Sequence, residues 1–275
     1  MFNPARLALM QPDAPVGAQH VAPFPEAIYA FLLDVAGQDE SRMDFGSEDA
    51  PLDNPGRDSA SLSIVSIDLS TLETLRAPTY RVVHRLQWTG LNHLTLFGQL
   101  KSLVETWNPQ HFVVDATGVG EGLYALLDKA FPTRVIPVRF NKEVKSELGW
   151  KFLSIIDTGR FRGLCGERAS GEHRPDLPSE GQTNEGEFAD RVRLQYVSCR
   201  SEVLPGPGKS LRWGVPEGAR GPDGQLIHDD FLLADSLVGI LDTLQWHAHL
   251  DMFAGGGFDP LLRMEGFAPY DRLRP

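Results

Sequence analysis

Hydrophobic and polar positions follow two different periods along the chain, and these periods separate predicted strands from predicted helices. Three runs rich in β-branched and aromatic residues come first, at Ala27–Val35, Ser61–Leu69 and Thr79–Trp88. Together they predict a three-stranded antiparallel meander. Gly37–Ala60, between the first two runs, is polar, acidic and punctuated by glycine and proline, so we expect a loop there.

Helical spacing alternates with short apolar runs in the middle of the chain. Leu94–Trp107 has its apolar residues on one face and predicts an amphipathic helix. A strand at Phe112–Val114, a helix after Gly120, a strand at Arg134–Phe140 and a helix at Asn141–Thr158 follow. This order predicts an α/β fold whose mixed sheet, of three antiparallel strands plus parallel strands, is flanked by helices.

The last third of the chain predicts a loop, a hairpin and a long helix. Phe161–Glu187 is rich in glycine, proline and charge, and we expect a surface loop there. Arg193–Ser198 and Leu211–Val215 predict the two strands of an added β-hairpin. The joint between them, at Leu204–Ser210, lacks the first glycine of a P-loop and precedes a strand, so we interpret it as a turn. Gln225–Leu244 is strongly apolar and predicts a helix.

The two ends of the chain differ from the middle. Met1–Pro25 is rich in proline and alanine without a sustained period, and residues 1–25 are therefore expected to be a linker or arm. Residues 26–252 would form one α/β domain, and residues 253–275 a C-terminal tail.

Charge and cysteine content narrow the class of protein. The net charge of −11 is unfavourable for a protein that binds nucleic acid through lysine and arginine alone. It is compatible with an enzyme that gathers carboxylates around cations and is held to its substrate by a partner. Cys165 and Cys199 form neither a disulfide framework nor a zinc-ligand spacing. Without a membrane-spanning run or a signal-peptide pattern, we expect a cytoplasmic protein with no membrane contact.

Three acidic positions lie where a purely structural carboxylate is either unfavourable or unnecessary. Asp34 lies in the first apolar run, and charged groups are rarely buried unpaired. Asp115 ends an apolar strand just before a glycine turn, so it is either a ligand or a turn former, and both remain open. His228, Asp229 and Asp230 precede the last helix, and together they exceed what one N-cap requires.

Other acids rank lower. Asp235 lies about 140° around the helix from Asp230 at 3.6 residues per turn, and its substitution is expected to leave activity largely intact. Asp39 lies in the polar loop with Glu40 and Asp44, where solvation is the expected role, and it remains only an auxiliary candidate.

The acidic positions predict a metal site if the fold brings them together. If the meander pairs on one side of the first strand and the parallel strands on the other, Asp34 and Asp115 become neighbours. The N-terminal end of the last predicted helix would then add Asp229 or Asp230 to this pair. Clustered carboxylates repel one another unless a cation is bound, and oxygen ligands favour Mg²⁺ or Mn²⁺. Two such ions about 4 Å apart can hold the attacking and leaving oxygens of a phosphodiester, which favours metal-dependent hydrolysis.

The chain resembles the RNase H-like nuclease domain of the large terminase subunit of tailed phages. The resemblance covers roughly Ala27–Leu250 and is carried by three motifs: LLDVAGQD, FVVDATGVGEGLYALL and IHDDFLLADSLV. It implies that Asp34 bridges two ions, that Asp115 binds one, and that Asp229 or Asp230 holds the other.

The segment NKEVKSELGWKFLSIIDTGR is also similar to that family. The similarity implies that Lys142 or Lys145 contacts DNA phosphate, with solvated lysines as the alternative. His228 is a further auxiliary candidate beside the acids of the last helix.

The resemblance implies an endonuclease that makes the initiating and terminating cuts in concatemeric double-stranded DNA, with weak sequence preference. The implied partners are DNA, a packaging ATPase domain, a portal and a small terminase subunit. The chain contains no Walker A motif, so we expect an excised domain, a split gene product or a fragment.

Three alternatives remain. A Holliday-junction resolvase, or another RNase H-like nuclease, would keep the fold with a different substrate. In an actin-like nucleotide-binding ATPase, DATGVGEG would be a phosphate loop and Asp34 would position the nucleotide Mg²⁺, but Ser66–Thr71 offers no glycine for the second loop. A catalytically silent docking module is disfavoured by the retained acids.

Overall fold

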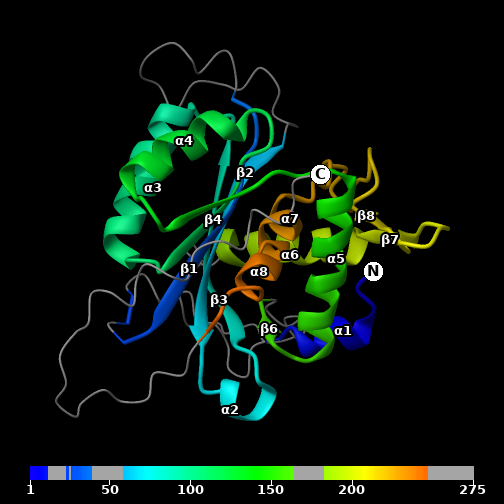
Figure 1. Ribbon diagram of the computed structural model, residues 1–275. Helices are drawn as coiled ribbons and strands as arrows, with labels where there is room; N and C mark the ends of the chain where they lie inside the picture. Colours follow the sequence, from blue (N-terminus) through cyan, green and yellow to red (C-terminus); the bar gives the residue numbers. More distant parts are fainter. Residues whose placement is uncertain (12–22, 25, 39–57, 164–182, 247–275) are drawn as a thin grey trace, which may run out of the picture.

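The fold is built on one mixed sheet with helices on both faces. The computed structural model describes residues 1–11, 23–24, 26–38, 58–163 and 183–246. In Figure 1 the sheet runs through the centre, and the strand order is β5-β4-β1-β2-β3-β6. The strands are β1 (Ile28–Asp34), β2 (Ser59–Asp68), β3 (Thr79–Thr89), β4 (His111–Asp115), β5 (Val135–Val138) and β6 (Phe161–Arg162).

The pairing directions confirm the expected fold class. β1, β2 and β3 form an antiparallel meander, and β4 pairs with β1 in parallel. β5 adds in parallel to β4, and β6 pairs in parallel with β3. The sheet is thus antiparallel in its meander and parallel towards β5, with β1 at the junction.

Helices cover each face of the sheet. On one face lie α3 (His93–Trp107) and α4 (Gly120–Ala130), and on the other lie α5 (Lys142–Asp157), α7 (Asp230–Ser236) and α8 (Val238–Leu241) (Figure 1). The short α2 (Leu72–Leu75) lies between β2 and β3. No helix among the described residues is long and apolar enough to cross a membrane.

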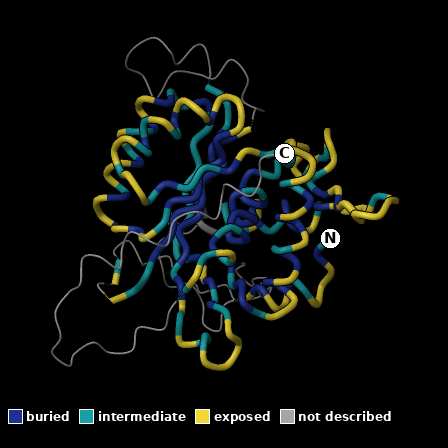
Figure 2. The backbone as a smooth tube through the Cα atoms, in the orientation of Figure 1, coloured by how far each residue is buried: buried dark blue, intermediate teal, exposed yellow. Residues whose placement is uncertain are grey.

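Each face buries its own hydrophobic core. Side chains alternate along a strand, so Ala30 and Leu32 of β1 enter the core shared with α5 and α7. Phe31 and Leu33 enter the core shared with α3 and α4. Figure 2 shows buried positions along the central strands and exposed positions on the outer helices. Because both faces of β1 are covered, its sequence is a continuous apolar run.

The beginning of the chain differs from the linker or arm expected at residues 1–25. Pro4–Leu9 forms helix α1, and the side chain of Asn3 accepts the backbone N–H of Arg6 to cap it. Phe2, Leu7 and Met10 are buried in the core beneath α5. Six helical residues are too few to show a period in the sequence, so only packing reveals this helix. Residues 12–22 and 25 lie outside the described residues, and the boundaries at 26–252 and 253–275 stay predictions.

The added hairpin forms, but its first strand lies later than expected. β7 (Arg200–Val203) pairs with β8 (Leu211–Gly214). Arg193–Ser198, predicted as a strand, is the end of helix α6 (Thr183–Ser198). Val192 and Tyr196 are both buried, and their spacing of four residues is helical. The expected loop at Phe161–Glu187 likewise begins with β6 and ends inside α6.

The final predicted helix is shorter and interrupted. Within Gln225–Leu244, helix α7 begins at Asp230 and α8 ends at Leu241. The residues before Asp230 are non-helical, and Leu226 bridges to Arg220 in antiparallel fashion. His228 and Asp229 therefore lie on the segment leading into α7.

Candidate active site

Asp34 and Asp115 lie at the carboxyl ends of neighbouring parallel strands. Leu33 of β1 pairs with Val114 of β4, which confirms the prediction that these two strands are adjacent. Each aspartate is only 8% exposed. Burial raises the pKa of both carboxyl groups. The pKa of Asp34 is raised further by the negative charges of four other acids: Asp115, Asp230, Asp229 and Asp58.

The turn after Asp115 depends on glycine. The backbone N–H of Thr117 donates to Asp115 Oδ1 at 2.8 Å, so Asp115 is also a turn former, the alternative that the sequence left open. Gly118 has a positive φ of 53°. A Cβ atom at Gly120 would lie 2.3 Å from the carbonyl oxygen of Asp115. The glycines let α4 begin directly behind the carboxylate.

Asp229 and Asp230 lie at the N-terminal end of α7. Asp229 occupies the N-cap position, but its side chain makes no cap hydrogen bond. Asp230 is 3% exposed, and its Oδ2 accepts hydrogen bonds from the Ser59 N–H and from Gln87 Nε2, both at 3.3 Å. Burial raises the pKa of Asp230 to about 7, and the nearby His228 opposes that rise.

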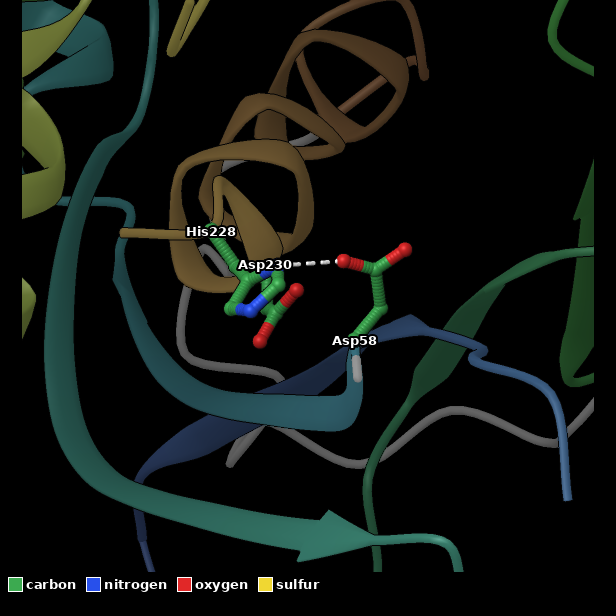
Figure 3. Close-up of side chains that lie close together, drawn as sticks. All are labelled: Asp58, His228 and Asp230. Carbon is green, nitrogen blue, oxygen red and sulfur yellow. Dashed lines mark ion pairs between the residues drawn. The ribbon is translucent and has the colours of Figure 1, made fainter. Parts of the chain in front are cut away.

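Asp58 is a candidate site residue that sequence reasoning missed. Its Oδ1 lies 2.5 Å from His228 Nδ1. Asp58, His228 and Asp230 each offer one ligand atom, and these atoms all lie within 4.8 Å of one another (Figure 3). The only sequence signal was an acid directly before β2, and the surrounding acidic loop concealed it. Asp39, the auxiliary candidate from that loop, lies outside the described residues.

Lys145 belongs to this cluster. Its Nζ lies 3.8 Å from Asp229 Oδ2 and 5.3 Å from the centroid of the Trp213 ring. The indole N–H of Trp213 donates to the backbone carbonyl of Lys145 at 2.6 Å, which fastens β8 to α5. Lys142 is exposed at the first position of α5. Of the two candidate lysines, the structure thus brings Lys145 beside the acids.

Asp235 has a different environment. It is fully buried, and its Oδ2 accepts from Arg85 and from the Tyr196 hydroxyl, both at 2.5 Å. These contacts tie α7 to β3 and α6. Asp235 therefore has a structural role, in line with its lower rank.

The donor set of the cluster suits a hard divalent cation. Carboxylate oxygens dominate it, and oxygen ligands favour Mg²⁺ or Mn²⁺. Neighbouring negative charges contribute to the raised pKa of Asp34 and of Asp230, and a bound cation would offset this repulsion. Among the described residues, the ligand atoms that lie within 4.8 Å of one another belong to Asp58, His228 and Asp230. Asp34, Asp115 and Asp229 are near enough to this group for their charges to interact, since Asp115 and Asp229 raise the pKa of Asp34.

Sequence comparison identifies a related family and two viral relatives. Residues 43–174 match the family model described as Terminase RNaseH-like domain. The probable terminase ATPase subunit of Haemophilus phage HP1 (strain HP1c1) is 31% identical over 82 residues, which are 30% of this chain and 14% of that relative. The terminase ATPase subunit of Escherichia phage P2 is 29% identical over 80 residues, 29% of this chain and 13% of that relative. The matches thus span a small part of either relative.

Solved structures share the fold over most of the chain. The large terminase nuclease from thermophilic phage G20c with bound magnesium aligns with a TM-score of 0.50 and 16% identity, covering 86% of this chain and 95% of that one. The cobalt-bound form of the same nuclease gives the same values. At this identity the likeness shows the fold. Together with the family match over residues 43–174 and the viral relatives, it confirms that this chain resembles RNase H-like domains of terminases.

Proposed function

We propose that this chain is a metal-dependent endodeoxyribonuclease that hydrolyses phosphodiester bonds of concatemeric double-stranded DNA during viral genome packaging. The observation that supports it best is the convergence of Asp34, Asp115, Asp229 and Asp230 at one end of the sheet, where burial raises the pKa of three of them. The magnesium-bound terminase nuclease with the same fold supports the same activity.

Two Mg²⁺ or Mn²⁺ ions are the proposed cofactors. Asp34 would be shared, Asp115 would hold one ion, and the Asp229–Asp230 pair would hold the other. When bound, the ions stabilise negative charge on the oxygens of the reacting phosphate. Asp58 and His228 would complete the ligand shell near Asp230.

Lys145 supplies positive charge beside these acids. Its contact with Asp229 and its position over Trp213 limit where the ammonium group can lie. In the proposed reaction it contacts a phosphate oxygen of the bound strand, where an ammonium group acts as a point charge.

The net charge of −11 implies that substrate is held by more than this chain. The 37 acidic residues outnumber the 26 lysine and arginine residues. Binding of DNA by the isolated chain should therefore be weak and should fade steeply with salt. A packaging ATPase domain, a portal and a small terminase subunit are the proposed partners that deliver DNA in the host cytoplasm.

A plasmid-cleavage assay tests the proposal. We expect nicking or cutting with Mg²⁺ or Mn²⁺ and none with EDTA, with little sequence preference. Cleavage that persists in chelator would contradict the metal requirement. Comparing a linear duplex with a four-way junction separates packaging-type cleavage from junction resolution, because strong preference for the junction would favour a resolvase.

A further inference from the structure

The first turn of α7 is capped from outside the helix. Asp229 is the N-cap residue, yet its side chain makes no cap hydrogen bond. Instead, Gln195 Oε1 accepts the backbone N–H groups of Phe231 at 2.9 Å and Leu232 at 3.2 Å. These are the second and third residues of the helix, whose N–H groups an N-cap side chain normally satisfies.

Gln195 is held firmly enough to perform this role. It is 6% exposed and belongs to α6. The next residue, Tyr196, donates to Asp235 further along α7. Helix α6 thus contacts α7 both at its first turn and near its end.

The capping group is also chemically suited to its surroundings. An amide oxygen accepts two N–H groups without adding negative charge beside clustered carboxylates. A second feature favours the outward position of Asp229, because a Cβ atom at Gly214 would lie 2.8 Å from Asp229 Oδ2. The missing side chain at Gly214 leaves room for this carboxylate next to Lys145.

We propose that Gln195 is a positioning residue that takes over the capping of α7 and so leaves the Asp229 carboxylate available to a divalent cation. The inference rests on the proposed function for the identity of that ligand. Aspartate is one of the best N-cap residues, so without Gln195 the Asp229 side chain would turn back towards Phe231 and Leu232. Metal binding and capping would then compete for one carboxylate.

Thermal melting of the metal-free protein tests the capping exchange without any cleavage assay. In the wild-type background, Asp229→Ala should change Tm little, because no cap is lost and the loss of the contact with the partly exposed Lys145 is offset by decreased repulsion among the acids. In a Gln195→Leu background, Asp229 has become the cap, so the same change should lower Tm by about 2–4 °C. Equal effects of Asp229→Ala in the two backgrounds would overturn the proposal. If Gln195→Leu does not fold, the shorter Gln195→Asn supplies the same comparison.

Metal titration provides the second readout. Gln195→Leu should weaken Mn²⁺ binding by about tenfold, as is usual when a group supporting a metal ligand is removed. Gln195→Glu keeps an acceptor oxygen and should retain the cap, so Asp229→Ala should not lower Tm in that background. Asn3→Ala removes the ordinary cap of α1 and should lower Tm without changing Mn²⁺ affinity.

These experiments can contradict the positioning role of Gln195 without contradicting the proposed function, and the reverse. Unchanged Mn²⁺ affinity in Gln195→Leu would contradict the positioning role. A wild-type protein that binds no Mn²⁺ would contradict the proposed function, while the melting comparison would still decide whether Gln195 replaces the Asp229 cap.

Discussion

Asp34 and Asp115 lie side by side at the ends of β1 and β4, because the parallel register pairs Leu33 with Val114. The backbone thus holds the two aspartates at adjacent strand ends, where both are buried. Burial raises the pKa of each, and the charge of Asp115 further raises that of Asp34. This arrangement is unfavourable for the ionised protein alone and favourable once a cation is bound.

Asp34→Asn tests whether Asp34 and Asp115 bind metal or instead stabilise the fold. The amide keeps the shape of the side chain and removes its charge, so stability without metal should hold or rise. Cleavage should fall by orders of magnitude, since charge stabilisation in the transition state is lost. Melting curves without metal and plasmid-cleavage rates, measured on the same preparation, distinguish the two roles. A folded Asp34→Asn protein that cuts at the normal rate would end the nuclease hypothesis.

The pKa of Asp230 predicts opposite effects of pH on stability and on metal binding. Between about pH 3.8 and 7 the folded state retains a proton that the unfolded state has released. The folded state then binds more protons, so this group's contribution to the free energy of unfolding falls as pH rises through that window. Metal ligands must be deprotonated, so the Tm increase caused by Mn²⁺ should grow from about pH 6 to pH 8.

Melting curves with and without Mn²⁺ across this pH range measure both effects. Asp230→Asn should flatten the metal-free dependence at that site. A Tm increase that is the same at every pH would contradict the assignment of Asp230 as a ligand.

Asp235→Asn should destabilise the fold. The change keeps the volume of the side chain but breaks an ion pair in which Asp235 is fully buried and Arg85 is 12% exposed. Breaking a buried ion pair costs about 3–5 kcal/mol. This variant therefore tests the stability of the fold, and any loss of activity should track unfolding. Denaturant unfolding measures the change, with Asp34→Asn as the contrasting variant. Wild-type stability of Asp235→Asn would show that the contact with Arg85 contributes little.

Substitutions of the two candidate lysines, Lys145 and Lys142, should have different effects on the cleavage rate. Lys145→Met removes the positive charge next to Asp229, and we expect cleavage to fall about tenfold, or ~1.4 kcal/mol. Lys142→Met is the matched control on the same helix and should change cleavage little. Initial rates at saturating DNA and metal give the comparison. Equal losses in both variants would indicate a general charge effect.

Asp58→Asn tests the acid that the sequence concealed. Asp58 is largely exposed, and exposed ion pairs stabilise little, so the free energy of unfolding should change by less than about 1 kcal/mol. If Asp58 helps to hold a cation with His228 and Asp230, Mn²⁺ affinity should nevertheless drop. Calorimetric titration of Mn²⁺ measures it. Unchanged affinity would remove Asp58 from the ligand set.

Local patterns in the sequence were sufficient for the framework of the sheet. The continuous apolar run of β1 predicts a strand covered on both faces. An unpaired aspartate buried in such a strand is unfavourable, which indicates a functional role for Asp34. The short strand before Asp115 and the glycine turn after it could also be predicted from the sequence, because strand and turn preferences depend on neighbouring residues along the chain. From those elements the adjacency of Asp34 and Asp115 followed by topology.

Other features depended on contacts between remote segments. Val192 and Tyr196 form a helix face only because α6 packs beside α7, so their sequence was equally compatible with a strand. Asp58 joins His228, and Gln195 caps α7, across 170 and 36 residues of sequence. Periodicity reports the burial of each residue but not its partner. Asp34, Asp115, Asp229 and Asp230 were therefore predictable as candidates from their positions in the sequence, whereas the contact of Asp58 with His228 and the cap by Gln195 were decided by tertiary packing.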